Sequence, residues 1–203
     1  MDEGRARGAL VGAARLLADY AHGTWDRLAE FLEKQTSNTD VFVINRSFET
    51  DIATMFDLWT TPEHVASWLP PAGMTMHFHR VEIRTGGEGF YSMGNGELTM
   101  YGRIAYTRIE RPHLLQYTQC FTDAQEKLSR HPMAPLWPAY MHTTVLLTEE
   151  GPSRTRVTVR WQPDPSATPE EIAAFADARS GMTVGWTGSL DKLEALIANS
   201  AQA

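Results

Sequence analysis

The chain has 203 residues, 42% of them hydrophobic and 21% charged, which fits one globular domain of moderate size. No stretch approaches the roughly 18 consecutive apolar residues that cross a bilayer, so the sequence excludes a transmembrane protein and predicts no membrane partner. With 18 Lys and Arg against 25 Asp and Glu, the net charge of −7 excludes a basic footprint for nucleic acid.

The cysteine content and the first residues indicate the compartment. Cys120 is the one cysteine and cannot form a disulfide within the chain. Residues 1–5 lack the basic start and the apolar stretch of a secretory leader. We therefore expect a cytoplasmic protein.

An amphipathic helix is predicted for residues 6–34. Gly23 interrupts its apolar stripe, and Thr24 is suited to cap a new helix, so the pattern fits one bent helix or two. The polar run 35–40 is typical of a linker, which makes residues 1–40 an N-terminal helical extension and residues 41–203 the main domain. The stripe recurs at intervals of three and four and consists of Leu10, Ala14, Leu17, Ala21, Trp25, Leu28 and Leu32.

This stripe is too apolar to stay in contact with water. Trp25, Leu28, Phe31 and Leu32 together expose on the order of several hundred Å² on an isolated helix, which favours burial at roughly 25 cal/mol per Å². We expect the helix either to fold back on its own domain or to pair with the equivalent helix of a second copy. A monomer and a homodimer through this helix both stay open.

The strand predicted from Val41 carries a charged residue on its apolar side. A buried guanidinium needs a carboxylate partner, and we expect Glu82 or Glu110 to supply it to Arg46. The apolar residues on the same side as Arg46 are Phe42, Ile44 and Phe48.

Two short helices and then a meander of antiparallel strands are predicted next. Asp51 is expected to cap the first helix, and Thr61 with Pro62 to start the second. The clearest strand covers residues 154–162, where apolar and polar residues alternate. Turn residues separate the strands at Gly86–Gly87, Gly94–Gly96 and Arg111–Pro112.

One long amphipathic helix is predicted after Thr168, because a capping hydroxyl, proline and two acids follow one another there. Gly181, Gly185 and Gly188 are expected to permit a close approach of this helix to the sheet. Its apolar stripe consists of Phe175, Arg179, Met182, Trp186, Leu190, Leu193 and Ile197.

The order of these elements describes a curved antiparallel sheet that grips a long C-terminal helix, an α+β helix-grip fold. Short motifs follow one another in a fixed order: Arg46 with Phe48, Thr61–Trp68, Arg84–Gly87, Gly102 ahead of Ile109–Pro112, and Gly185–Leu193. Through these motifs, residues 41–198 resemble the activator-of-heat-shock-protein-ATPase homologues of the START/birch-pollen-allergen superfamily (SRPBCC). Glu82 stands where that family usually has Asp. A subgroup is also similar through Phe121–Asp123, Arg130–Met133 and Trp137–Pro138.

The resemblance implies a cavity between the concave face of the sheet and the long helix, lined by large apolar side chains. Each such side chain, taken alone, is more often plain core. Nine methionines favour an adaptable lining. The candidate ligand-binding residues are Met76, Phe78, Tyr91, Met93, Tyr106, Tyr117, Phe121, Val159, Trp161, Phe175, Met182 and Trp186.

Metal and cofactor sites are not predicted. His77 and His79 point the same way from one strand, but zinc needs further ligands. Nothing in the spacing of His142, Cys120 and Asp123 requires them to lie near these histidines. No dinucleotide fingerprint, phosphate loop or nucleophile elbow is present, so we expect no cofactor and name no catalytic residue.

The sequence therefore favours a non-catalytic protein that binds a small apolar molecule in a cavity. A co-chaperone-like or regulatory adaptor that acts through its surface is the first alternative. The second is a cyclase or hydratase of the kind that the superfamily also contains, with Asp123, Arg130 and His131 as its polar groups. Cys120 is expected to be a small buried hydrophobic residue without a cation beside it.

Overall fold

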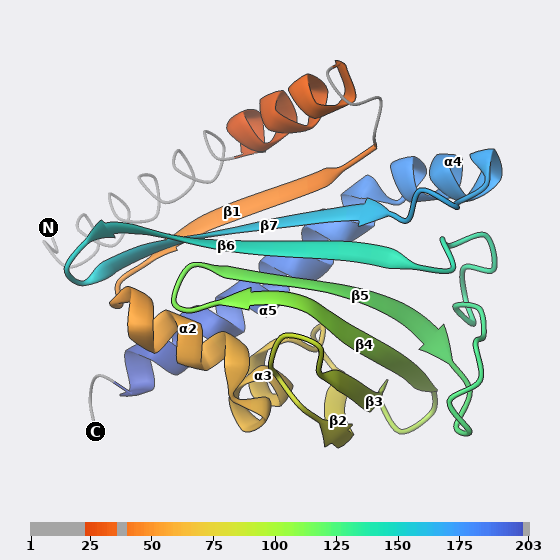
Figure 1. Cartoon of the computed structure of the whole chain (residues 1–203), viewed down its shortest axis with the longest axis horizontal. Coiled ribbons are helices and arrows are strands. Elements are labelled where there is room, and N and C mark those ends of the chain that lie inside the picture. The colour runs from red at the N-terminus through yellow and green to blue at the C-terminus, as the bar shows by residue number, and fades with distance from the viewer. Residues whose placement is uncertain (1–22, 36–39, 201–203) are drawn as a thin grey trace, which may run out of the picture.

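The computed structural model describes residues 23–35 and 40–200, and its described strands form one curved sheet (Figure 1). All neighbouring strands run antiparallel, in the order β1-β7-β6-β5-β4-β3-β2. The predicted α+β helix-grip fold is confirmed. The seven strands of the described part are β1 (Phe42–Phe48), β2 (Thr75–Val81), β3 (Glu88–Gly94), β4 (Thr99–Glu110), β5 (Leu114–Thr122), β6 (Met141–Gly151) and β7 (Arg154–Pro163).

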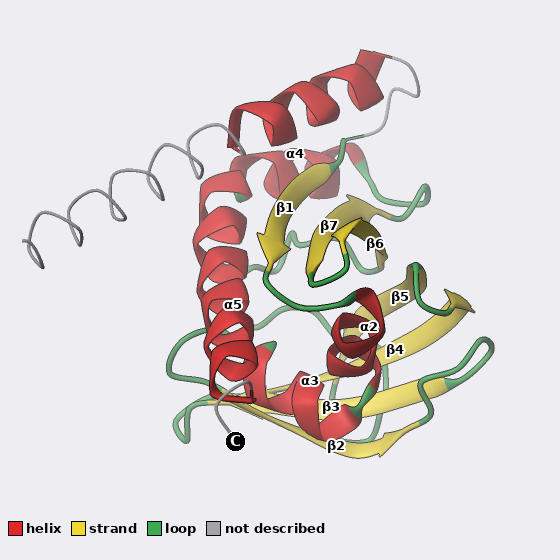
Figure 2. Ribbon diagram, turned by 90° about the vertical axis from the view of Figure 1, so that its left-hand side faces the viewer, coloured by secondary structure: helices red, strands yellow, loops and turns green. Residues whose placement is uncertain are grey.

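The helices cover the concave side of this sheet. Figure 2 shows α5 running along one side of the molecule, near β1 at one end and near α3 at the other. No helix in the described residues has both the length and the apolar character needed to span a membrane. The cytoplasmic location stays a prediction. Besides residues 23–35, the helices are α2 (Ile52–Thr60), α3 (Pro62–Trp68), α4 (Pro169–Asp177) and α5 (Arg179–Ser200).

Local side-chain contacts explain where the helices begin. The Asp51 carboxylate accepts backbone N–H groups of the first turn of α2, as predicted. Thr168 and Glu171 form a reciprocal capping box at α4. The Thr61 side chain makes no capping bond, so Pro62 alone marks the start of α3.

The prediction of one continuous C-terminal helix is wrong, because the structure has two helices, α4 and α5. Ala178, with φ −76° and ψ −1°, separates α4 from α5. Phe175 before this break and Met182 after it are both buried. One non-helical residue, Ala178, does not change the spacing of the apolar side chains along the sequence. The sequence pattern therefore did not reveal the break.

Arg46 is partly buried, but the predicted carboxylate partners are wrong. Its guanidinium lies 2.6 Å from the Asp191 carboxylate and 3.7 Å from that of Glu194, both on α5, and its side chain is 15% exposed. Glu82 and Glu110 instead pair with arginines near them in the sequence. The reason is topological: β1 and β2 are opposite edges of the sheet, and the concave side of β1 faces α5.

We predict that Arg46→Ala destabilises the protein by about 1–2 kcal/mol, between the values for surface and buried ion pairs. Arg108→Ala is the matched control, because Arg108 and Glu110 are both more than half exposed. Urea unfolding checks this expectation, and equal midpoints for the two variants would contradict it.

The helix of residues 23–35 packs against β1 and α5 with its charged side. Glu30 accepts the Val43 N–H at 2.8 Å and pairs with the Arg179 guanidinium at 2.8 Å. Glu33 pairs with Arg160 of β7. The expectation that the main domain covers the apolar stripe is therefore wrong for the described residues, since Trp25 is 65% exposed.

Two other predictions concern the cap at Thr24 and the segments on either side of this helix. Gly23 and Thr24 are both helical, so Thr24 does not precede a new helix as its cap. The stripe positions before Gly23, and residues 36–39 of the predicted linker, lie outside the described residues.

Asp26 is the most deeply buried charged residue of this helix, at 5% exposure. Its carboxylate accepts the side-chain amide of Asn45. Burial raises the pKa of Asp26 to about 7, and the hydrogen bonds from Asn45 offset only part of this rise. The folded chain therefore holds a proton at Asp26 that the unfolded chain releases near pH 4.

This difference predicts that stability falls as the pH rises from about 4 to about 7, because the folded state binds the extra proton throughout that window. Asp26→Asn removes the titration while keeping the shape, so the variant should be the more stable protein at pH 8. Thermal unfolding from pH 5 to pH 8, with the exposed Asp177→Asn as control, measures the two slopes. Parallel profiles for wild type and Asp26→Asn would refute the assignment.

Candidate functional site: the concave face of the sheet

The concave face of the sheet and the facing helices hold the residues that were predicted to bind a ligand. Nine of the twelve belong to one packed cluster or lie against it, and Met76, Met93 and Phe121 do not. Five are buried: Tyr106, Tyr117, Val159, Phe175 and Met182. The half-buried ones are Met76, Phe78, Tyr91, Met93, Phe121, Trp161 and Trp186.

The ring of Tyr91 lies directly over Gly102, its cross-strand partner on β4. A Cβ atom at Gly102 would collide with this ring, so any larger residue there requires the ring to move. The ring of Tyr91 also meets that of Phe78 edge-on, with centroids 6.3 Å apart. Gly102 thus lets an aromatic side chain lie flat on the concave face.

Large indole rings lie between α5 and two neighbouring elements, α2 and β7. The α5 backbone approaches the sheet closely at β1 and otherwise contacts α3 and α4. Trp186 of α5 meets Trp161 of β7 edge-on at 6.1 Å and stacks with Trp59 of α2 at 6.5 Å. Trp59 continues to Trp68 at 4.5 Å, and Trp161 to Trp137 at 5.5 Å. Five tryptophans therefore form one connected series through the interior.

Two members of this series carry hydrogen-bond donors that lack acceptors. The indole N–H groups of Trp59 and Trp161 are buried and unpaired within the described residues. The indole N–H of Trp68, by contrast, donates to the Leu58 carbonyl at 3.0 Å. A buried donor without an acceptor costs about 1–3 kcal/mol, so these two groups are specific features of the interior that need an explanation.

Three phenol groups lie on the same face and stay protonated. Burial raises the pKa values of Tyr91 and Tyr106, and the nearby Tyr117 hydroxyl raises both further. Burial also raises the pKa of Tyr117 to about 12. The rings of Tyr106 and Tyr117 lie 5.7 Å apart. At physiological pH the concave face therefore presents O–H donors among apolar walls.

One flank of α5 is covered beside its later turns and open beside its earlier turns. Ser189 and Lys192 on this flank donate to the carbonyls of Leu69 and Pro70, which follow α3. Gly185 and Gly188 lie four residues before them, one helical turn nearer the start of α5 on the same flank. A Cβ atom at either glycine meets no atom within 4 Å.

The expected close approach at the α5 glycines is therefore wrong. Gly181, like the other two, has open space where a Cβ atom would stand. The covering segment from α3 ends beside the later turns of α5, and the earlier turns have no comparable cover on that flank.

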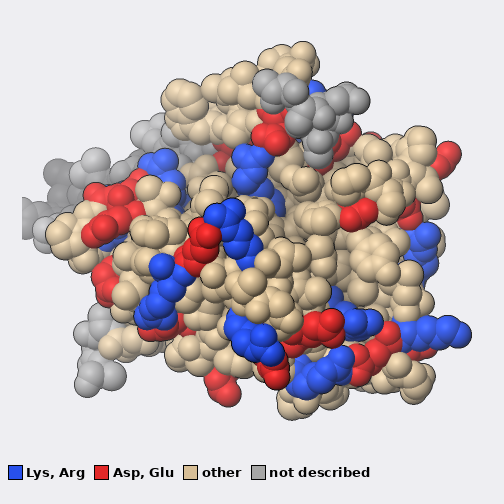
Figure 3. Space-filling model, in the orientation of Figure 1, with Lys and Arg blue, Asp and Glu red and all other residues tan. Residues whose placement is uncertain are grey.

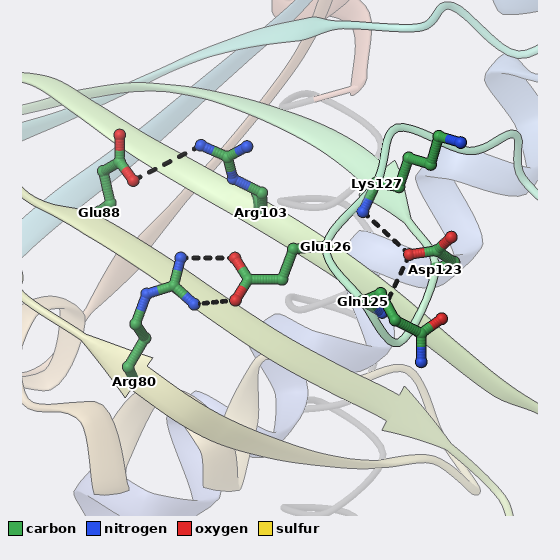
Figure 4. Close-up of polar contacts among 7 residues, drawn as sticks. All are labelled: Arg80, Glu88, Arg103, Asp123, Gln125, Glu126 and Lys127. Atoms are coloured by element: carbon green, nitrogen blue, oxygen red, sulfur yellow. Dashed lines mark hydrogen bonds and ion pairs between the residues drawn. The ribbon is translucent and has the colours of Figure 1, made fainter.

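The three polar groups of the enzyme alternative each have a local structural partner. The Asp123 carboxylate accepts the backbone N–H groups of Gln125 and Lys127 in its own turn (Figure 4). Arg130 pairs with the buried Glu171. The His131 ring packs edge-on against Phe121, and burial lowers its pKa, so it is neutral at pH 7.

A separate hollow of about 160 Å³ lies on the convex face, lined by β4, β5 and the following loop. Arg103 and Cys120 are cross-strand partners there, which corrects the expectation that Cys120 has no cation beside it. Burial raises the pKa of the Cys120 thiol more than Arg103 lowers it, so the thiol stays protonated. Glu126, which is bonded to Arg80 (Figure 4), is one of the residues that line this hollow.

The paired histidines also lie on the convex side. The rings of His77 and His79 are 4.9 Å apart, and His79 bonds with the Ser92 hydroxyl at 3.1 Å. Within the described residues, no group of three or more His, Cys, Asp or Glu side chains is placed to hold a metal ion.

Sequence reasoning missed Trp59, Trp68 and Trp137 as parts of the interior series. Trp59 and Trp68 are nine residues apart in the predicted pair of short helices, and two indoles in so short a segment were the available signal. The position of Trp137, in an irregular loop, has no periodicity that could have placed it.

Comparison with known proteins agrees with the fold. The family described as "Activator of Hsp90 ATPase homolog 1-like protein" matches residues 49–198. The chain belongs to this family. No curated protein is significantly similar to it in sequence.

Solved structures with the fold of the Activator of Hsp90 ATPase homolog 1-like family come from several bacteria. The protein Ms6760 from Mycobacterium smegmatis has a TM-score of 0.64 at 19% identity, over 78% of this chain and 91% of its own. A protein from Arthrobacter aurescens has a TM-score of 0.65 at 24% identity, over 78% and 86%. The AHSA1 protein from Silicibacter pomeroyi has a TM-score of 0.61 at 18% identity, over 79% and 99%. At these identities the likeness extends to the fold alone.

The open flank of α5 generates a prediction. Gly185→Ala should stabilise the protein by about 0.5–1 kcal/mol, because Ala is the better helix former and its Cβ atom meets nothing. Gly102→Ala should destabilise it, because the Tyr91 ring has to move. Chemical denaturation of both variants checks this pair, and a loss of stability in Gly185→Ala would mean that the flank is closed.

Proposed function

We propose that this member of the Activator of Hsp90 ATPase homolog 1-like family binds a small, uncharged, mainly apolar molecule that carries hydrogen-bond acceptor oxygens. The molecule is held between the concave face and α5 and is not chemically changed. The observation that carries this proposal is the set of interior donors without acceptors, above all the indole N–H groups of Trp59 and Trp161. A ligand oxygen supplies the missing acceptor and removes a penalty of about 1–3 kcal/mol for each donor.

The charges beside α5 favour an uncharged ligand. Arg46 is paired with Asp191 and Glu194, and Arg179 is paired with Glu30. A ligand carboxylate would have to compete with these acidic side chains for a cation. Ketone, ether and hydroxyl oxygens need only the neutral donors of Trp and Tyr.

The half-buried side chains and the open flank support binding between α5 and the sheet. Trp161 and Trp186 are not fully buried, and they provide flat surfaces for a planar molecule. Gly185 and Gly188 leave the adjacent flank of α5 uncovered. The local partners of Asp123, Arg130 and His131 favour binding without catalysis.

Two fluorescent probes test the ligand chemistry. 6-Propionyl-2-(dimethylamino)naphthalene carries a ketone, and 2-(dimethylamino)naphthalene is the matched probe without it. The wild type should bind the ketone probe more tightly. Trp161→Phe or Tyr117→Phe should reduce this preference by about fivefold, the equivalent of one hydrogen bond of ~1 kcal/mol. Tyr140→Phe is the control, because Tyr140 lines the convex hollow.

A second comparison tests where the probe binds. Trp186→Ala should weaken the binding of both probes, since it removes a ring from the interior series. Arg156→Ala should leave binding unchanged, because the exposed Arg156 of β7 pairs with Glu150 of β6 and contacts no member of the interior series. Thermal unfolding of each variant establishes that it is folded at the assay temperature. Equal binding by wild type and Trp186→Ala would refute the proposed position, and no binding of either probe would refute the proposal.

A further inference from the structure

The helix of residues 23–35 contacts the main domain through its acidic side, whereas an amphipathic helix usually packs through its apolar side. Its inward side carries Asp26, Glu30 and Glu33, which bond to β1, α5 and β7. These contacts are specific, because Glu30 binds both a backbone N–H and a guanidinium at 2.8 Å. The helix therefore has a defined orientation, and its opposite side is directed outward.

The outward side is apolar. Trp25 is 65% exposed, Leu28 43% and Phe31 59%, and Leu32 beside them is 52% exposed. Spacings of three and four place these side chains on one helical face. Figure 3 shows an uncharged surface at the top of the molecule, where Figure 1 places this helix. Four large apolar residues in one patch mark an interaction surface.

We propose that this apolar face is the interface of a homodimer, in which the helix pairs with the same helix of a second copy across a two-fold axis. The inward contacts fix the helix on each protomer, so pairing joins two complete domains. An isologous interface of this kind uses the same patch on both copies and closes after two subunits.

The exposed area of the patch sets the strength of this interface. The described patch exposes on the order of 400 Å² per copy, mostly from Trp25 and Phe31. Two copies of the described patch together bury about 800 Å², the size of a weak interface that forms at high protein concentration.

The charge pattern disfavours a membrane surface as the occupant. Helices that lie on membranes carry Lys and Arg on the polar side that faces the headgroups. Here the polar side carries Asp26, Glu30 and Glu33, which are bonded to the main domain, and the chain has a net charge of −7. A second copy requires no basic residues, because its matching face is apolar.

Light scattering after size exclusion, at about 100 µM protein, tests the proposal. The wild type should have twice the mass of one chain, and Leu28→Glu with Phe31→Glu should have the mass of one chain. Val184→Glu is the matched control, because Val184 is also exposed, at 75%, but lies on α5. It should remain a dimer.

Circular dichroism and thermal unfolding show whether the double variant is folded, which is expected because both side chains face solvent in the single chain. A monomeric wild type, including one whose residues 1–22 cover the patch, would overturn the proposal. So would an unchanged mass in the double variant. Binding of the wild type to anionic phosphatidylserine vesicles with loss of the dimer would favour a membrane instead. The probe assays address the interior, so their outcome is independent of this one.

Discussion

Tryptophan side chains set the distance between α5 and the sheet. The backbone of α5 comes close to the sheet at β1, where Arg46 pairs with two carboxylates, and is supported elsewhere by α3 and α4. Between these supports, Trp186 reaches Trp59 on one side and Trp161 on the other. Indoles fill a wide gap with few atoms that can hydrogen bond, so their N–H groups become the main polar features of the space. The breadth of the interior and the donor chemistry both depend on this spacing.

The amino-acid sequence predicts the fold because its evidence is local and repeated. Alternation in β7, the cap at Asp51 and the capping box at Thr168 each specify one element, and the elements occur in the order of a helix-grip fold. The site is less predictable. Pattern identifies which residues face inward, but not which inward donors lack partners, since pairing depends on the positions of atoms from distant segments. The Trp68 indole N–H donates to the Leu58 carbonyl, whereas the Trp59 indole N–H has no acceptor among the described residues. Both tryptophans belong to the same short helical pair.

Two of the wrong predictions, for Arg46 and for the N-terminal helix, share one physical cause. Both assumed that a residue interacts with the nearest suitable partner in the expected layer. Arg46 instead reaches α5, because β1 lies at the opposite sheet edge from Glu82. The N-terminal helix was expected to bury its apolar side, yet its acidic side found cations and a free N–H on the neighbouring elements. Hydrophobic periodicity identifies a face that avoids water without specifying whether the same chain covers it.

The bond from Val43 to Glu30 has a consequence for the solution behaviour of the sheet. β1 is an edge strand with β7 on one side only, and the backbone groups on its free side are able to pair with another strand. Glu30 occupies one of these groups, and the helix that carries it lies along the edge (Figure 1). A carboxylate at such an edge also repels the backbone carbonyls of an approaching strand. The helix of residues 23–35 thus blocks the addition of another strand at β1. Conditions that release this helix expose the β1 edge, which is suited to aggregation.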